Sequence, residues 1–224
     1  MAGVFPNVEF KLGRRRMSKA TRKWLAKKRE YLSDMWTYEG SEIMGKIVEQ
    51  CGFAFPAKTV AEGMVVYLNE HKKGETLGDM YGTKPLECKL YVRRRDIWSN
   101  VEAPLVHELI HCLTWQKFYF DQRWIRPSFF ADVFADELMT SVVECLVLGR
   151  RADYRTCNRA ISYALDEAAV RISKTGQCEQ LVKALMAFFE EYRVKMKNKE
   201  SNILKEREQV LRALPSLVPV SIND

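Results

Sequence analysis

The pentapeptide His107-Glu108-Leu109-Ile110-His111 has the clearest chemical potential in the sequence. It lies in a largely apolar stretch, residues 101–115, that predicts a helix, and residues four apart on a helix share one face. His107 and His111 could therefore reach the same metal ion. Glu108 is turned away from direct ligation but stays close enough to exchange a proton with bound water. Two imidazoles, an open coordination position and an adjacent carboxylate are what a hydrolytic zinc site requires.

The motif is specific in a chain that has only three histidines. A chance H-E-x-x-H is expected roughly 0.004 times in a chain of this composition. Ser99 and Glu102 fit the S-x-x-E capping box that begins many helices. Because Pro104 is tolerated only in a first turn, the helix could also begin a residue or two later. The alternative to a metal site is an ordinary amphipathic helix whose two histidines are hydrogen-bonded in the core.

The composition predicts a folded chain that needs no disulfides. Its 224 residues, 47% of them hydrophobic, are enough to form a sizeable core. The six cysteines are scattered without a C-x-x-C pair, which argues against a cysteine-based zinc finger and favours a reducing compartment. No apolar run approaches the ~20 residues that span a bilayer, and the N-terminus lacks the apolar core of a secretory signal. We therefore expect a cytoplasmic protein with no membrane partner.

Positive charge is concentrated near the N-terminus of a chain whose net charge is +7. Between Lys11 and Arg29 there are ten lysines and arginines and no acidic residue, with Trp24 inside the run. Such a segment can bind nucleic acid or an acidic protein surface, and the alternative is a solvated helix face or a flexible arm. We expect residues 1–30 to form a basic arm and residues 31–224 to form a single domain.

Short β-branched segments and longer amphipathic segments predict an α+β fold that is mainly helical. Residues 64–68 and 89–93 have the pattern of strands, and the glycine-rich residues between them predict a loop or a long hairpin connection. Helices are predicted near residues 18–30, 41–50, 101–115, 131–148, 152–173, 177–197 and 200–214. The expected architecture is a small antiparallel or mixed sheet beside the H-E-x-x-H helix, with a helical part from about residue 150 to 214.

Strands that lead directly into an H-E-x-x-H helix resemble the zincin metallopeptidases. The resemblance implies a zinc ion held by His107 and His111, with Glu108 as the general base. It also implies that residues 89–94 form an edge strand, to which a peptide substrate adds by backbone pairing. The basic N-terminal segment and the stretch from Phe134 to Met139 are similar to the compact ImmA/IrrE-type and phage-encoded metallopeptidases.

A catalytic zinc usually has three protein ligands, so the motif leaves one position to be filled. We expect a carboxylate on the 131–148 helix, which would make the site gluzincin-like. Glu137 is the first candidate, because gluzincins use glutamate and because the 26 positions after His111 leave room for a loop and a returning helix. Three other carboxylates on the same helix remain open: Asp132, Asp136 and Glu144.

These features predict a zinc-dependent metallopeptidase of narrow specificity. Glu108 would take a proton from metal-bound water as it attacks the scissile carbonyl and then pass that proton to the leaving amine. The developing oxyanion needs a further donor, and four residues are open candidates: His71, Tyr119, Arg123 and Tyr154. The alternative function is a non-catalytic zincin-fold binding protein whose basic arm binds nucleic acid or an acidic partner.

Overall fold

The computed structural model describes residues 5–72, 78–81, 86–119, 129–150, 153–167 and 175–217. The chain divides into two compact units, the first formed by Met1–Val48 and Ala54–Asp121 and the second by Glu49–Phe53 and Gln122–Asp224. The boundary predicted at residue 30 falls inside a helix of the first unit. No helix among the described residues has both the length and the apolar character needed to cross a membrane.

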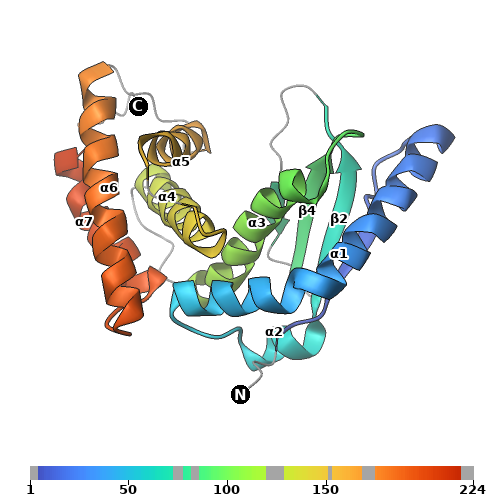
Figure 1. Cartoon of the computed structure of the whole chain (residues 1–224), viewed down its shortest axis with the longest axis horizontal. Helices are drawn as coiled ribbons and strands as arrows, with labels where there is room; N and C mark the ends of the chain where they lie inside the picture. Colours follow the sequence, from blue (N-terminus) through green and yellow to red (C-terminus); the bar gives the residue numbers. More distant parts are fainter. Residues whose placement is uncertain are drawn as a thin grey trace. The chain divides into compact units, whose positions relative to one another are not determined.

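The first unit contains a small sheet and the helices that pack on it. Its elements in chain order are β1 (Val8–Leu12), α1 (Lys19–Cys51), α2 (Ala57–Glu62), β2 (Met64–Glu70), β3 (Gly78–Tyr81), β4 (Leu86–Val92) and α3 (Trp98–Tyr119) (Figure 1). The strand order is β1-β2-β4-β3. Strands β1, β2 and β4 are parallel, and the short β3 pairs antiparallel with β4. Together with the helices of the second unit, this makes the described chain mainly helical with a small sheet, as predicted.

We expected an antiparallel or mixed sheet, but the body of the sheet, formed by β1, β2 and β4, is parallel, and only the short β3 pairs antiparallel. The two predicted strands are β2 and β4, and they pair in parallel with Val66 opposite Cys88. The third parallel strand, β1, comes from the segment predicted as a separate arm and places Phe10 opposite Val66. Its cue is a short alternation, with Val8 and Phe10 buried and Glu9 exposed, beside a long basic run. Residues 8–12 are therefore part of the sheet.

Strand β4 is not an edge strand where it pairs with β3, which corrects the role predicted for residues 89–94. The pairing runs from Gly78 opposite Leu90 to Tyr81 opposite Glu87. In the described sheet β3 therefore occupies the edge next to β4. The prediction failed because β3 is short and begins with glycine, inside a stretch whose glycine content is typical of a loop.

Helices α1 and α3 cover the same face of the sheet. Phe10 and Cys88 are both in register with Val66, so their side chains project from one face. The ring of Phe10 meets Trp36 of α1 edge-on at a centroid distance of 6.3 Å. Cys88 is hydrogen-bonded to Cys112 of α3, and α3 also packs against β3 and β4. The helix that carries the motif is thus held directly against the sheet.

The basic segment continues into α1, a single helix where the sequence predicted two. The helix begins after Ser18, whose Oγ accepts the backbone N–H of Thr21 at 3.1 Å. It is followed by Gly52, which has a φ of 77°. Leu25 and Leu32 are fully buried, so the basic first half of α1 is anchored in the core of the unit.

All regular elements among the described residues of the second unit are helices. Its helices are α4 (Phe129–Val147), α5 (Tyr154–Glu167), α6 (Thr175–Lys197) and α7 (Ile203–Leu217). Helix α4 packs on α5 and α7, and α6 packs on the same two helices. The hydroxyl of Tyr192 donates to the backbone oxygen of Gln50 at 2.6 Å, which holds residues 49–53 to this unit. Gly149, with a φ of 62°, follows the end of α4 close to the limit predicted at residue 148.

Candidate metal centre

Helix α3 begins at Trp98, slightly earlier than the predicted capping box requires. The side chain of Asn100 accepts the backbone N–H of Ile97 at 3.1 Å, which satisfies a donor at the helix start. Ser99 therefore lies inside the helix. Pro104 falls in the second turn, where the ring removes one hydrogen bond to the preceding turn.

The start of α3 is tied to α1 by side-chain hydrogen bonds. The indole N–H of Trp98 donates to Glu39 at 2.6 Å, and its backbone N–H donates to the hydroxyl of Tyr31 at 3.1 Å. Lys28 donates to the backbone oxygen of Asp96 just before the helix. These contacts, together with packing on the sheet, fix the position of α3 within the first unit.

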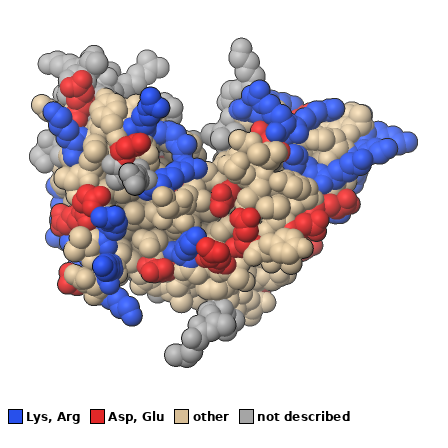
Figure 2. Space-filling view, in the orientation of Figure 1, with Lys and Arg blue, Asp and Glu red and all other residues tan. Residues whose placement is uncertain are grey.

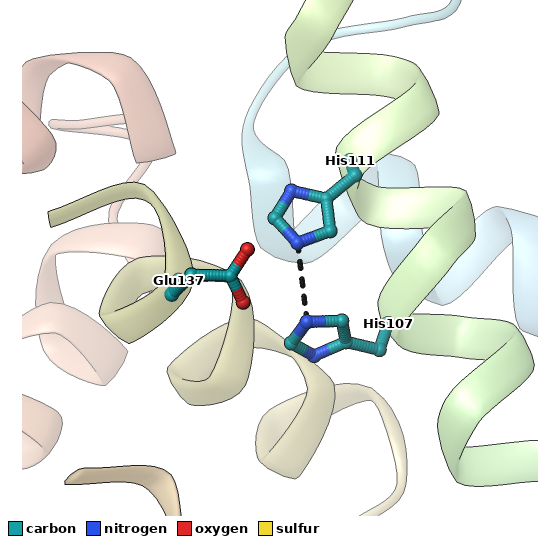
Figure 3. A group of neighbouring side chains, drawn as sticks. All are labelled: His107, His111 and Glu137. Carbon is teal, nitrogen blue, oxygen red and sulfur yellow. Dashed lines mark hydrogen bonds between the residues drawn. The ribbon is translucent and has the colours of Figure 1, made fainter. Parts of the chain in front are cut away.

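The two motif histidines lie in the buried centre of α3, where His107 is 4% and His111 7% exposed. Their Nε2 atoms are 3.1 Å apart, and their rings meet edge to face at 4.7 Å (Figure 3). With metal–nitrogen bonds of about 2.05 Å, this separation corresponds to an angle of about 98° at the metal, close to the tetrahedral value of about 109°. The same distance also fits a hydrogen bond between two neutral rings.

Glu108 is 4% exposed and packs against the beginning of β3. A Cβ atom placed on Gly78 would lie 2.4 Å from Glu108 Oε1 and 2.7 Å from its Cγ. The carboxylate therefore occupies the space that a side chain at position 78 would fill. Gly78 is the site residue that the sequence analysis missed, because its role depends on the pairing of β3 with β4.

Two thiols lie behind the motif, between α3 and β4. A hydrogen bond to Cys112 and burial raise the pKa of Cys88 well above its usual range, and the nearby charge of Glu108 adds to this effect. The Cys88 thiol therefore stays protonated at neutral pH. Cys112 is 1% exposed and lies about 100° around the helix from His111, so it contributes packing.

Glu137 lies on α4 and is half-buried. One potential ligand atom each from His107, His111 and Glu137 lie within 4.8 Å of one another, a group that could hold a metal ion. Figure 3 shows the carboxylate directed toward the two Nε2 atoms. Two imidazoles and one glutamate form a donor set typical of catalytic zinc.

The other carboxylates predicted as third ligands are placed differently. Glu144 is 7% exposed and accepts from Arg150 and Arg159, both at 3.2 Å. Asp136 lies 4.0 Å from Arg207. Asp132 is within α4, but its side chain lies outside the described residues. Glu144 and Asp136 thus interact with arginines of the second unit and do not belong to the histidine group.

The candidates for oxyanion stabilisation receive no support from the described geometry. His71 follows β2 and donates its backbone N–H to Val92 at 3.0 Å. Tyr154 is 54% exposed at the start of α5. The side chain of Tyr119 and the whole of Arg123 lie outside the described residues. Among the described residues, the geometry therefore brings together His107, His111 and Glu137 but favours none of these four candidates as an oxyanion donor.

Comparison of the chain with protein-family models, with curated proteins and with solved structures found no match. A function for this site must therefore be argued from its own geometry.

Proposed function

We propose that this chain is a zinc-dependent metallopeptidase with a zincin-like fold, in which His107, His111 and Glu137 hold the metal. The observation that carries the proposal is the approach of two buried Nε2 atoms to 3.1 Å, with a buried glutamate next to His107 on the same helix. An ordinary helix core needs none of these groups, whereas a hydrolytic zinc site needs all of them. The carboxylate of Glu137 supplies the further ligand that a gluzincin-like site requires.

A bound zinc ion would act as a Lewis acid and lower the pKa of a coordinated water from about 15.7 toward ~7. Glu108 is the base that takes the proton of the attacking water and returns it to the leaving amine. Proton transfer by a placed group contributes roughly 10²–10⁴-fold to such reactions. The contact with Gly78 restricts where the Glu108 carboxylate can lie, and this orients the base before substrate arrives.

The substrate of the proposed reaction is an extended peptide that pairs with β3. This strand is the edge of the described sheet on the side of β4, and its first residue touches Glu108. Backbone pairing along β3 would lay a peptide beside the base, with affinity from main-chain hydrogen bonds and selectivity from side-chain positions. We place the activity in the reducing cytoplasm, which is supported by five described cysteines that are buried and unbridged.

The test compares zinc content after gel filtration with hydrolysis of an unstructured protein such as casein. Wild type should retain zinc and hydrolyse the substrate. Glu108→Gln should retain zinc and lose at least 10²-fold in rate, because only the base is removed. Glu137→Ala should lose most of its zinc, whereas the control Glu144→Ala should keep it, since Glu144 interacts with Arg150 and Arg159 instead.

Two outcomes would contradict the proposal. If wild type binds no zinc even after reconstitution, the histidine pair is a hydrogen-bonded part of the core. If zinc is bound and Glu108→Gln hydrolyses casein at the wild-type rate, the metal has a role other than peptide hydrolysis through this base.

A further inference from the structure

Two arginine triplets, Arg14–Arg16 and Arg93–Arg95, are brought to the same end of the first unit. The first triplet follows β1 and the second follows β4. Because β1, β2 and β4 are parallel, their carboxyl ends lie side by side, and the residues that follow them emerge at the same end of the sheet. The start of α1 adds exposed Lys19, Arg22 and Lys23. We call these nine residues the basic end.

Contacts with aromatic side chains fix several of these arginines. Arg15 donates to the hydroxyl of Tyr91 at 3.3 Å, and its guanidinium carbon lies 5.1 Å from the ring centroid. Arg94 lies 5.5 Å from the ring centroid of Trp24 in α1. Because Tyr91 belongs to β4 and Trp24 to α1, these contacts join both triplets to the same small region of the unit. The charges are thus positioned by the fold.

Positive charge exceeds negative charge in this region. Figure 2 shows lysines and arginines gathered over the first half of α1 and the adjoining strand ends. Glu87 is paired with Arg14 at 3.2 Å, and Asp96 accepts the backbone N–H of Arg93 at 2.7 Å. The first turn of α1 contains no acidic residue, so its helix dipole adds to the positive potential. The basic end therefore attracts a polyanion.

We infer that the basic end binds the phosphate backbone of a nucleic-acid duplex without reading its sequence. Guanidinium groups match phosphate oxygens in planar, bidentate geometry, and several of them on one surface suit a repeating phosphate chain. The rings of Tyr67 and Tyr91 are only 9% and 4% exposed, and the half-buried ring of Trp24 already carries Arg94 at 5.5 Å, so these rings are poorly placed to stack with unpaired bases. Backbone contacts to a duplex therefore fit better than the base stacking used for single strands.

The test is fluorescence anisotropy of a labelled random-sequence DNA duplex of about 20 base pairs, titrated with the full chain between about 50 and 200 mM salt. Wild type should bind with an affinity that falls steeply with salt. The variant Arg16→Ala/Lys19→Ala/Arg95→Ala removes three exposed cations for which the described residues provide no ion pair. Its slope of log affinity against log salt should fall by about 2 to 3, with at least tenfold weaker binding at low salt.

A matched control removes three exposed cations of the second unit, as Lys183→Ala/Lys197→Ala/Arg212→Ala. This control has the same net charge as the test variant and should bind the duplex as wild type does. Glu108→Gln should also bind normally, so that failure of the proposed peptidase and failure of this inference can be told apart. Circular dichroism and thermal melting establish that each variant is folded.

Three results would overturn the inference. The first is equal loss of duplex binding in the test and control variants, which would show a non-specific effect of net charge. The second is a poly-glutamate peptide that binds as tightly as the duplex at the same salt concentration, which would favour an acidic protein partner. The third is tighter binding to vesicles containing phosphatidylserine than to the duplex, which would favour a membrane surface.

Discussion

Replacing Gly78 with alanine should impair Glu108 without altering a metal ligand. The added Cβ would lie 2.4 Å from Glu108 Oε1, 2.7 Å from its Cγ and 2.8 Å from its Cδ. Non-bonded heavy atoms at their optimal separation are about 3.5 Å apart. Either the carboxylate must move by about 1 Å, or β3 must shift away from α3 by a similar distance.

A displacement of this size is large for a catalytic base. Misplacement of a reacting group by about 1 Å can cost about 10²-fold in rate, and complete loss of proton transfer costs roughly 10²–10⁴-fold. We therefore expect Gly78→Ala to lower kcat/KM by about 10²-fold. Overpacking of a buried contact should also lower the free energy of unfolding by about 1–3 kcal/mol.

The assay measures casein hydrolysis, zinc content and thermal melting on the same preparations. Gly45→Ala is the matched control, because among the described residues a Cβ there would meet only Phe5, at an ordinary 3.8 Å. Gly45 lies inside α1, where alanine is favoured over glycine by about 0.5–1 kcal/mol. The control should hydrolyse casein at the wild-type rate and melt at the same temperature or slightly higher.

A Gly78→Ala variant that is folded, retains its zinc and hydrolyses casein at the wild-type rate would contradict this prediction. That result would mean that the position of Glu108 against β3 has no bearing on the reaction. Loss of zinc in this variant would also count against it, because β3 would then be positioning the ligands and not only the base.

Three further substitutions test other parts of the structure. Glu144→Ala removes a buried carboxylate that pairs with two arginines, and urea denaturation should show a loss of about 1–3 kcal/mol. Tyr192→Phe loses the hydrogen bond to Gln50 and should cost about 1 kcal/mol. Burial raises the pKa of Tyr192, so the folded protein keeps the phenol protonated at pH values where the unfolded chain loses the proton. The associated part of the free energy of unfolding of wild type should therefore be constant below about pH 10 and fall at higher pH. In Tyr192→Phe the fall in the free energy of unfolding should be smaller. In a Cys178→Ser variant no thiol should react quickly with Ellman's reagent at about pH 8. Burial raises the pKa of Cys145 to about 12 and that of Cys157 to about 11, so little reactive thiolate is present at that pH. Fast labelling of the folded variant would contradict the buried positions of these thiols.

The predictable part of the site is the part whose contacts are local in sequence. His107 and His111 are one helical turn apart, so their meeting follows from helix geometry once the segment is known to be helical. Glu137 was suggested by resemblance to gluzincins, and helix geometry alone gives no distance to residues on another helix. Gly78 could not be predicted, because its contact with Glu108 depends on the pairing of β3 with β4, and the glycine content of this stretch predicts a loop.

The same distinction explains the outcome for the fold. Helices of the second unit were predicted with small errors at the ends that the structure describes, because apolar spacing is a local signal; the limits predicted at residues 152 and 173 lie outside the described residues. Strand β1 was missed because five residues with a weak alternation stand next to a conspicuous basic run. Its position depends on parallel pairing with β2, about 56 residues further along the chain, and no local pattern reports such a pairing.

The free energy of unfolding distinguishes two roles for the paired imidazoles of the candidate metal centre: binding a metal ion, or forming a structural hydrogen bond with each other. If the 3.1 Å approach is a structural hydrogen bond, replacing both rings by leucine removes a buried interaction and leaves little gain. If the rings serve to bind a metal, burying two polar imidazoles lowers the free energy of unfolding of the metal-free protein, and well-packed leucines would avoid this loss. We therefore expect His107→Leu/His111→Leu to unfold at the same or a higher urea concentration than metal-free wild type. A loss of more than about 2 kcal/mol in the double variant would instead identify the histidine pair as part of the structural core.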